Sequence, residues 1–259
     1  MYLEKELKAA IEACNIAQAE VLKIYASNFN VEIKSDNSPV TAADKKSDEI
    51  IREYLKCRFS KYAFLTEESF DDKARLNNDY VWIIDPVDGT DDFVHRDDEF
   101  TINIALSYKH EAVLGVICVP AKNELFYAVK GEGSYVIRNN KATRIHVSNK
   151  TKDLTCYTSV FHLSKKEEDM IEKHKDIISK VQKLGSSIKG CYIAEGKGDI
   201  SYRMSSGTKE WDSAAFQVIV EQAGGFVLKP DGTRMFYNRE DVFNREGYLI
   251  VNNMKNFLL

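Results

Sequence analysis

The chain has 259 residues, of which 44% are hydrophobic and 29% charged, a balance typical of a soluble globular enzyme with one large or two small domains. Its net charge of −4 at pH 7 argues against a protein that binds nucleic-acid polymers or membrane surfaces, since such proteins usually carry basic patches. A small polyanionic substrate stays compatible with this charge, because a metal ion can supply positive charge locally.

The first half of the chain predicts two helices and then strands. Apolar residues spaced by three or four predict an amphipathic helix over 3–25. After a loop at 34–40, the Thr41-x-x-Asp44 spacing fits a capping box that opens a second helix. The apolar run 81–84 is ended by Asp-Pro and predicts a buried strand that stops at a site. Between 101 and 148, β-branched and aromatic runs separated by short turns predict an antiparallel meander.

After residue 150, strand and helix patterns alternate. We predict a strand at 156–160, a helix near 165–183, a strand at 200–204 and a helix over 210–223 that ends at Gly224-Gly225. Two further strands, at 225–230 and 247–252, close the chain. The pattern predicts an α/β sandwich with a soft boundary between an N-terminal part, 1–150, and a C-terminal part, 151–259.

The sequence shows no sign of export or membrane insertion. Its first ten residues lack the basic and apolar regions of a secretory signal, and no apolar run approaches the roughly 20 residues that span a bilayer. The five scattered cysteines have no CxxC spacing and are interpreted as buried thiols. We therefore expect a cytoplasmic protein.

The segment from Asp85 to Thr90 carries the strongest chemical signal. Asp85 and Asp88 follow a predicted strand, and the Val87 carbonyl between them adds a third oxygen of the kind that Mg²⁺ prefers. The backbone N–H groups of Gly89 and Thr90 are candidates for docking a phosphate oxygen, and the Thr90 hydroxyl for orienting a water. By itself the segment also fits an ordinary turn, because Asp-Pro and Asp-Gly are common turn pairs. An EF-hand is excluded, since Arg96 stands where its twelfth-position Glu is required.

Three other acidic groups have plain structural explanations when each is taken alone. Glu67-Glu68 fits a solvated surface pair. Asp212 lies in the first turn of a predicted helix, where a negative charge favours the helix dipole. Asp44 is explained by its capping box.

Together these groups belong to three motifs in a fixed order, which read Glu67-Glu68-Ser69, then DPVDGTDDF over 85–93, then WDSAA from Trp211 with AGG at 223–225. With them the chain resembles the lithium-sensitive, Mg²⁺-dependent phosphatase superfamily that includes inositol monophosphatases and bisphosphate nucleotidases. The resemblance implies a five-layered αβαβα sandwich of the inositol monophosphatase and fructose-1,6-bisphosphatase type. It also implies a site for two or three Mg²⁺ ions.

The resemblance further implies a role for each matching residue. Glu67, Asp85 and the Val87 carbonyl would hold one ion; Asp85, Asp88 and Asp212 would hold a second; and Glu67 or Glu68 would lie near a third. Thr90, hydrogen-bonded to Asp44, would help to activate the attacking water, which makes Asp44, Thr90 and Glu67 the expected catalytic residues. The expected substrate-binding residues are Asp88, Gly89, Thr90, Gly185, Ser186, Lys209, Asp212 and Arg245.

Finer motifs bear on the substrate. The runs 34–44, 99–106, 185–189, 194–196 and 244–247 are similar to those of bacterial 3'(2'),5'-bisphosphate nucleotidases of the CysQ type. The expected reaction is therefore removal of the 3'-phosphate from adenosine 3',5'-bisphosphate, with Lys209 and Arg245 as candidates for the 5'-phosphate. Four further acidic residues near the motif are interpreted as solvated: Asp91, Asp92, Asp97 and Asp98.

Other functions stay open at this point. One is an inositol monophosphatase or a broad sugar phosphatase, and another is a non-catalytic metal- or nucleotide-binding module. A homodimer is compatible with the wider family.

Overall fold

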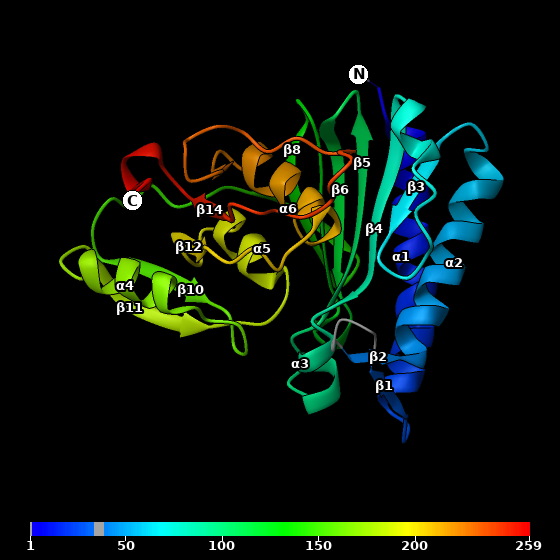
Figure 1. Ribbon diagram of the computed structural model, residues 1–259, viewed down its shortest axis with the longest axis horizontal. Helices are drawn as coiled ribbons and strands as arrows, with labels where there is room; N and C mark the ends of the chain where they lie inside the picture. The colour runs from blue at the N-terminus through cyan, green and yellow to red at the C-terminus, as the bar shows by residue number, and fades with distance from the viewer. Residues whose placement is uncertain (1, 34–38) are drawn as a thin grey trace.

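The computed structural model describes residues 2–33 and 39–259 and arranges them in five layers. In Figure 1, α1 and α2 form one outer layer, followed by a seven-stranded sheet, then α5 and α6, then a five-stranded sheet, and finally α4. The predicted αβαβα sandwich is confirmed, although its last helical layer is only the nine-residue α4 (Lys165–Lys173).

The outer helical layer consists of α1 (Glu4–Tyr25) and α2 (Ala42–Arg58), as predicted. Small buried residues such as Ala13 and Ala17 let α1 pack closely on α2 and on the sheet. The capping box predicted at Thr41 and Asp44 is present and begins α2. A two-stranded antiparallel sheet precedes it, formed by β1 (Val31–Ile33) and β2 (Pro39–Thr41). The predicted loop at 34–40 lies outside the described residues over 34–38, and its remainder is the start of β2.

The seven-stranded sheet contains the predicted meander. Its first two strands are parallel and the others pair antiparallel in chain order. In spatial order the strands are β3 (Ala63–Thr66), β4 (Tyr80–Asp88), β5 (Thr101–Tyr108), β6 (Glu111–Val119), β7 (Glu124–Val129), β8 (Gly133–Arg138) and β9 (Lys141–Ile145). β4 runs further than the predicted strand because Asp88 still pairs with Thr101, across an irregularity that begins at Asp85.

The five-stranded sheet has the order β11-β10-β12-β14-β13. Its strands are β10 (Leu154–Thr158), β11 (Ile178–Lys183), β12 (Ile200–Arg203), β13 (Phe226–Leu228) and β14 (Tyr248–Val251). The prediction of one helix over 165–183 was wrong in its second half, since 178–183 pairs with β10 as a parallel edge strand. Ile178 and Val181 fit a helical spacing, but both are β-branched, and pairing with β10 outweighs the weak helical signal.

Two helices lie between the sheets: α5 (Ile188–Ala194) and α6 (Glu210–Gln222). α6 contacts β5 and β6, and Gly115 on β6 allows that contact, because a Cβ there would lie 2.2 Å from the Ala215 carbonyl oxygen. A buried cluster extends from the seven-stranded sheet through α5 and α6, and it includes Ile83 and Ile219. The core therefore continues across the soft boundary near residue 150.

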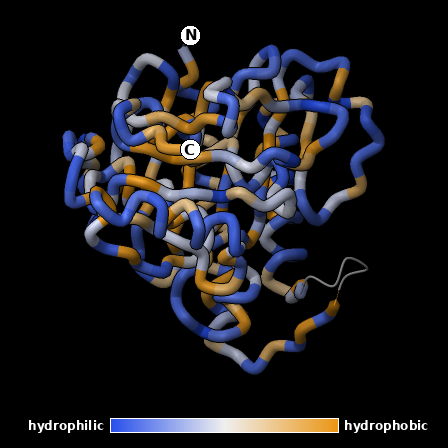
Figure 2. The backbone as a smooth tube through the Cα atoms, turned by 60° about the vertical axis from the view of Figure 1, so that its left-hand side comes forward, coloured by the Kyte–Doolittle hydropathy of each residue, from blue (hydrophilic) through white to orange (hydrophobic). Residues whose placement is uncertain are grey.

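Hydrophilic and hydrophobic residues alternate along much of the chain, as Figure 2 shows. Within residues 2–33 and 39–259, no helix combines the length and the apolar character needed to span a membrane. All five cysteines are free thiols; four are buried as expected, but Cys57 is exposed.

The short helical segments complete the chain. They are α3 (Thr90–His95) and the 3₁₀ helices η1 (Ala74–Asn77), η2 (Pro120–Lys122) and η3 (Met254–Asn256).

Candidate active site

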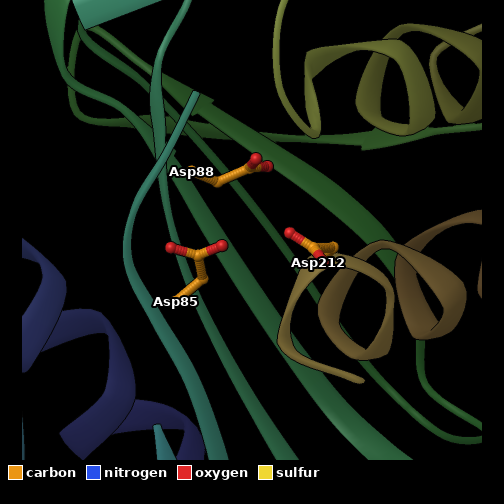
Figure 3. A group of neighbouring side chains, drawn as sticks. All are labelled: Asp85, Asp88 and Asp212. Atoms are coloured by element: carbon orange, nitrogen blue, oxygen red, sulfur yellow. The ribbon is translucent and has the colours of Figure 1, made fainter. Parts of the chain in front are cut away.

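Three aspartates from two layers meet beside the end of the seven-stranded sheet. Asp85 and Asp88 lie at the end of β4, and Asp212 lies in the first turn of α6. One carboxylate oxygen from each lies within 4.8 Å of the others, and Figure 3 shows the side chains directed toward a shared space. Oxygen ligands at this separation suit a hard divalent cation.

The electrostatics of this cluster call for a cation. Burial raises the pKa of Asp85 well above its ordinary value, and the charges of Glu67 and Asp88 raise it further. Burial, with Asp88 and Glu67, raises the pKa of Asp212 to about 7. Among the described residues, Asp85 Oδ1 is buried and has no hydrogen-bond partner. A bound metal ion would satisfy that oxygen and offset the repulsion, so the residues fit the Mg²⁺ that the motifs imply.

Asp88 is fixed by residues from two other elements. Its Oδ2 accepts hydrogen bonds from Asn103 Nδ2 at 3.1 Å and from Ser187 Oγ at 2.5 Å. Asn103 Nδ2 also donates to Ser187 Oγ at 2.9 Å. The runs 99–106 and 185–189, which the sequence linked only by resemblance, thus meet at a candidate metal ligand. Such outer hydrogen bonds orient ligating carboxylates.

The Thr90 hydroxyl donates to Asp44 Oδ1 at 3.1 Å, and the Val87 carbonyl lies 3.3 Å from the same hydroxyl. Asp44 is itself held by Thr41, whose backbone N–H and hydroxyl donate to Oδ2 at 2.8 and 2.7 Å. Burial raises the pKa of Asp44. While Thr90 donates to Asp44, its oxygen remains available to accept a hydrogen bond from a water molecule.

The turn after Asp88 depends on two glycines. Gly89 has φ +86°, and a Cβ there would lie 3.0 Å from the Asp92 carboxylate. A Cβ at Gly185 would lie 2.4 Å from the same carboxylate. The interpretation of Asp92 as solvated was therefore wrong, because its side chain is enclosed between two turns and burial raises its pKa to about 7.

Of the two remaining expected metal ligands, Glu67 lines the cavity and Glu68 does not. Glu67 lines the cavity next to the aspartates and raises the pKa of Asp44, Asp85 and Asp212 through its charge. Glu68 does not belong to the cavity lining of the described chain.

The cavity beside these carboxylates has a volume of about 380 Å³ and is lined by two unlike sets of residues. The carboxylates are called its acidic wall here. The cationic wall is the set of Lys189 of α5, Arg203 at the end of β12 and Lys209 before α6, and His162 lines the cavity as well. Burial lowers the pKa of Lys189 to about 8, and its ammonium donates to the carbonyls of Leu184 and Ser186 at 3.0 and 2.7 Å.

A contact across the cavity mouth joins the two halves of the chain. The His162 ring lies 3.2 Å from the Asp91 carboxylate, and Arg203 donates to the His162 carbonyl at 2.8 Å. The interpretation of Asp91 as solvated is thus incomplete, whereas Asp97 and Asp98 are exposed as expected.

The expected substrate-binding residues divide into two groups. Gly89, Ser186 and Lys209 line the cavity, and the Gly185 N–H donates to Glu99 at 2.7 Å behind it. Arg245 is not brought to the cavity, because its guanidinium pairs with Asp241 at 2.8 Å and lies over the Phe243 ring.

Sequence reasoning missed five residues of the site: Asn103, His162, Ser187, Lys189 and Arg203. Asn103, Ser187 and Lys189 stand inside runs whose resemblance had been noted, so that signal was available. His162 and Arg203 lie in no motif, and a histidine in a loop or an arginine at the end of a strand does not by itself indicate a functional site.

Comparisons with known proteins agree with this geometry. A model of the family described as the inositol monophosphatase family matches residues 2–257. The Nus factor SuhB of Pasteurella multocida is 34% identical over 236 residues, which cover 87% of this chain and 85% of that protein. The 3'(2'),5'-bisphosphate nucleotidase CysQ of Buchnera aphidicola is 32% identical over 231 residues, covering 87% and 86%. The crystal structure of CysQ from Bacteroides thetaiotaomicron superposes with a TM-score of 0.85 at 34% identity, covering 97% of this chain and 99% of that one.

Proposed function

The chain belongs to the inositol monophosphatase family of phosphatases, and we propose that within it the protein is a Mg²⁺-dependent 3'(2'),5'-bisphosphate nucleotidase. The proposed reaction converts adenosine 3',5'-bisphosphate and water to AMP and phosphate. A cytoplasmic location, lithium inhibition and a homodimer belong to the same proposal and rest on the family resemblance.

The proposed metal ligands are Asp85, Asp88, Asp212, Glu67 and the Val87 carbonyl, for two or three ions. The clustered carboxylates and the unpartnered Asp85 oxygen support them. Bound Mg²⁺ would neutralise the phosphate dianion, lower the pKa of the attacking water and stabilise the leaving oxygen.

The chain's own residues position the reactants. Thr90 donates to Asp44, so its oxygen can accept a hydrogen bond from the attacking water and direct a water lone pair toward phosphorus. Asn103 and Ser187 hold the Asp88 carboxylate in place through the reaction. As the bond between the water oxygen and phosphorus forms, the bond from phosphorus to the ribose 3'-oxygen breaks. The attacking water gives up a proton to solvent, and the leaving 3'-oxygen takes one up to become a hydroxyl.

The observation that supports a bisphosphate is the cationic wall, which lines the same cavity as the aspartates. Lys189, Arg203 and Lys209 offer charge for a second phosphate in the same cavity. The cavity volume of about 380 Å³ lies within the range of small-molecule sites, which is roughly 300–1,000 Å³.

The test is a comparison of substrates. Phosphate release is measured with Mg²⁺ from adenosine 3',5'-bisphosphate, inositol 1-phosphate and fructose 1,6-bisphosphate. We expect the highest kcat/KM for the nucleotide and AMP as the product detected by chromatography. Preference for inositol 1-phosphate or the sugar bisphosphate would overturn the nucleotide assignment, and no turnover on any of the three would favour a binding module.

A further inference from the structure

A buried charged network lies outside the cavity lining of the described residues and joins the two segments that carry Glu67 and Asp212. Its centre is Glu210, the first residue of α6, whose side chain is fully buried. The Glu210 carboxylate accepts the backbone N–H of Asn238 at 2.6 Å and of Arg239 at 2.8 Å. It also accepts Arg239 Nε at 3.2 Å.

The network continues from Asn238 to the segment that follows Glu67. The Asn238 side-chain oxygen accepts Arg75 Nη1 at 2.8 Å, and Arg75 is 2% exposed. The same guanidinium binds Asp71 through two hydrogen bonds, at 3.0 and 2.8 Å. Asp71 lies four residues after Glu67. Between them, Ser69 is held by a hydrogen bond to Asp48 of α2, at 2.8 Å.

On its other side the network holds the start of α6. Arg239 Nη2 donates to Asn244 at 2.8 Å, and Asn244 Nδ2 donates to the Lys209 carbonyl at 2.8 Å. The Lys209 N–H in turn donates to the Asp212 carboxylate. A continuous set of hydrogen bonds therefore runs from the segment after Glu67 to Asp212.

Such a network needs an explanation beyond stability. Burying ion pairs usually brings little net stability, because the lost hydration offsets the attraction. In the described part of the chain, Arg75, Asn238 and Glu210 all lie outside the cavity lining, so they do not touch substrate. What they share is that together they connect the segment after Glu67 to the first turn of α6, which carries Asp212.

We propose that the Arg75–Asn238–Glu210 network is a positioning device, which sets Glu67 and Asp212 at the separation that Mg²⁺ binding requires. The inference rests on the proposed metal site. Groups that orient ligands from outside the coordination shell typically change metal affinity about 10- to 100-fold when they are removed.

The test is Mg²⁺ binding by isothermal titration calorimetry to protein freed of metal with EDTA and then dialysed. We compare wild type with Glu210→Gln, which keeps the shape and removes the charge. The expected result is about tenfold weaker Mg²⁺ binding, with kcat recovered when Mg²⁺ is raised to saturation. The matched control is Glu221→Gln, which breaks the ion pair of Glu221 with Arg234 at the other end of α6 and should leave Mg²⁺ affinity unchanged.

A second variant covers the case in which Glu210→Gln does not fold. Asn238→Gly suits the left-handed backbone at that position, φ +56°. It removes the side-chain hydrogen bonds to Arg75 and to the Asn78 carbonyl, and it keeps the backbone N–H that Glu210 accepts. It is expected to weaken Mg²⁺ binding in the same direction. Unchanged Mg²⁺ affinity in this variant, with only a lower Tm, would overturn the positioning role. If wild type itself binds no Mg²⁺, the proposed metal site fails instead, so the two failures are distinguishable.

Discussion

The two walls of the cavity are built in opposite ways. The acidic wall comes mainly from one short stretch, because Asp85, Val87 and Asp88 follow each other at the end of β4, and only Glu67 and Asp212 come from elsewhere. The cationic wall is assembled from residues of separate elements: Lys189, Arg203 and Lys209. The comparison teaches that the residues that indicate the reaction class lie close together in the sequence, whereas those proposed to select the substrate are dispersed along it.

The largest expected effect is the loss of activity when a carboxylate of the acidic wall is replaced. Asp88→Asn keeps the shape and its contact with Ser187 but removes one charge from the cluster. We expect kcat to fall by about a thousandfold or more, since the metal contributes several kcal/mol and each 1.36 kcal/mol is tenfold. Circular dichroism should show an intact fold. The control Asp79→Asn changes an exposed aspartate that lies 4.0 Å from Lys109 and should keep full activity. Undiminished turnover in Asp88→Asn would refute the site.

An intermediate loss of activity is expected when a residue of the cationic wall is replaced. Lys189→Met keeps the length of the side chain and removes its charge. If this wall holds the second phosphate, kcat/KM for adenosine 3',5'-bisphosphate should fall about 30-fold, and that for inositol 1-phosphate only a few-fold. Lys130→Met, at an exposed pair with Glu111, serves as the control. An equal loss on both substrates would mean that Lys189 serves the fold of the 184–187 turn rather than substrate choice.

The smallest expected effect is on stability and pH. The Asp212 pKa of about 7 and the raised pKa of Asp85 mean that folding keeps protons on these groups that the unfolded chain loses above about pH 4. Metal-free protein should therefore lose stability as pH rises from about 4 to about 7. In EDTA at pH 8, Asp212→Asn should melt about 5 °C above wild type. Mg²⁺ should remove that advantage by raising the Tm of wild type. Equal Tm values in EDTA would contradict the assigned repulsion.

Features that depend on local sequence signals could be predicted, and features assembled from distant segments could not. The layered fold and the helix that carries Asp212 could be predicted, because apolar spacing, a capping box and Gly224-Gly225 are local signals. The acidic wall could be predicted because its motif is nearly contiguous. Arg203 could not, since nothing local distinguishes a strand-end arginine that faces a cavity from one that faces solvent.

Two errors have the same physical origin. Asp92 was interpreted as solvated because aspartates in a polar run usually are, but the turn at Gly185 closes over it. Residues 178–183 were predicted as helix because their apolar spacing fits one, while a distant strand supplied the hydrogen bonds. In both cases the deciding partner lies far away in the sequence.

The contact at Gly115 sets a limit on how this chain can evolve. Any side chain at that position would meet the backbone of α6 at Ala215 and push away the helix whose first turn carries Asp212. In a library of single substitutions assayed for phosphatase activity, position 115 should therefore be among the least tolerant, although it bears no chemical group. Substitutions at Gly115, which has no Cβ, should therefore be selected against as strongly as substitutions of the carboxylates of the candidate site.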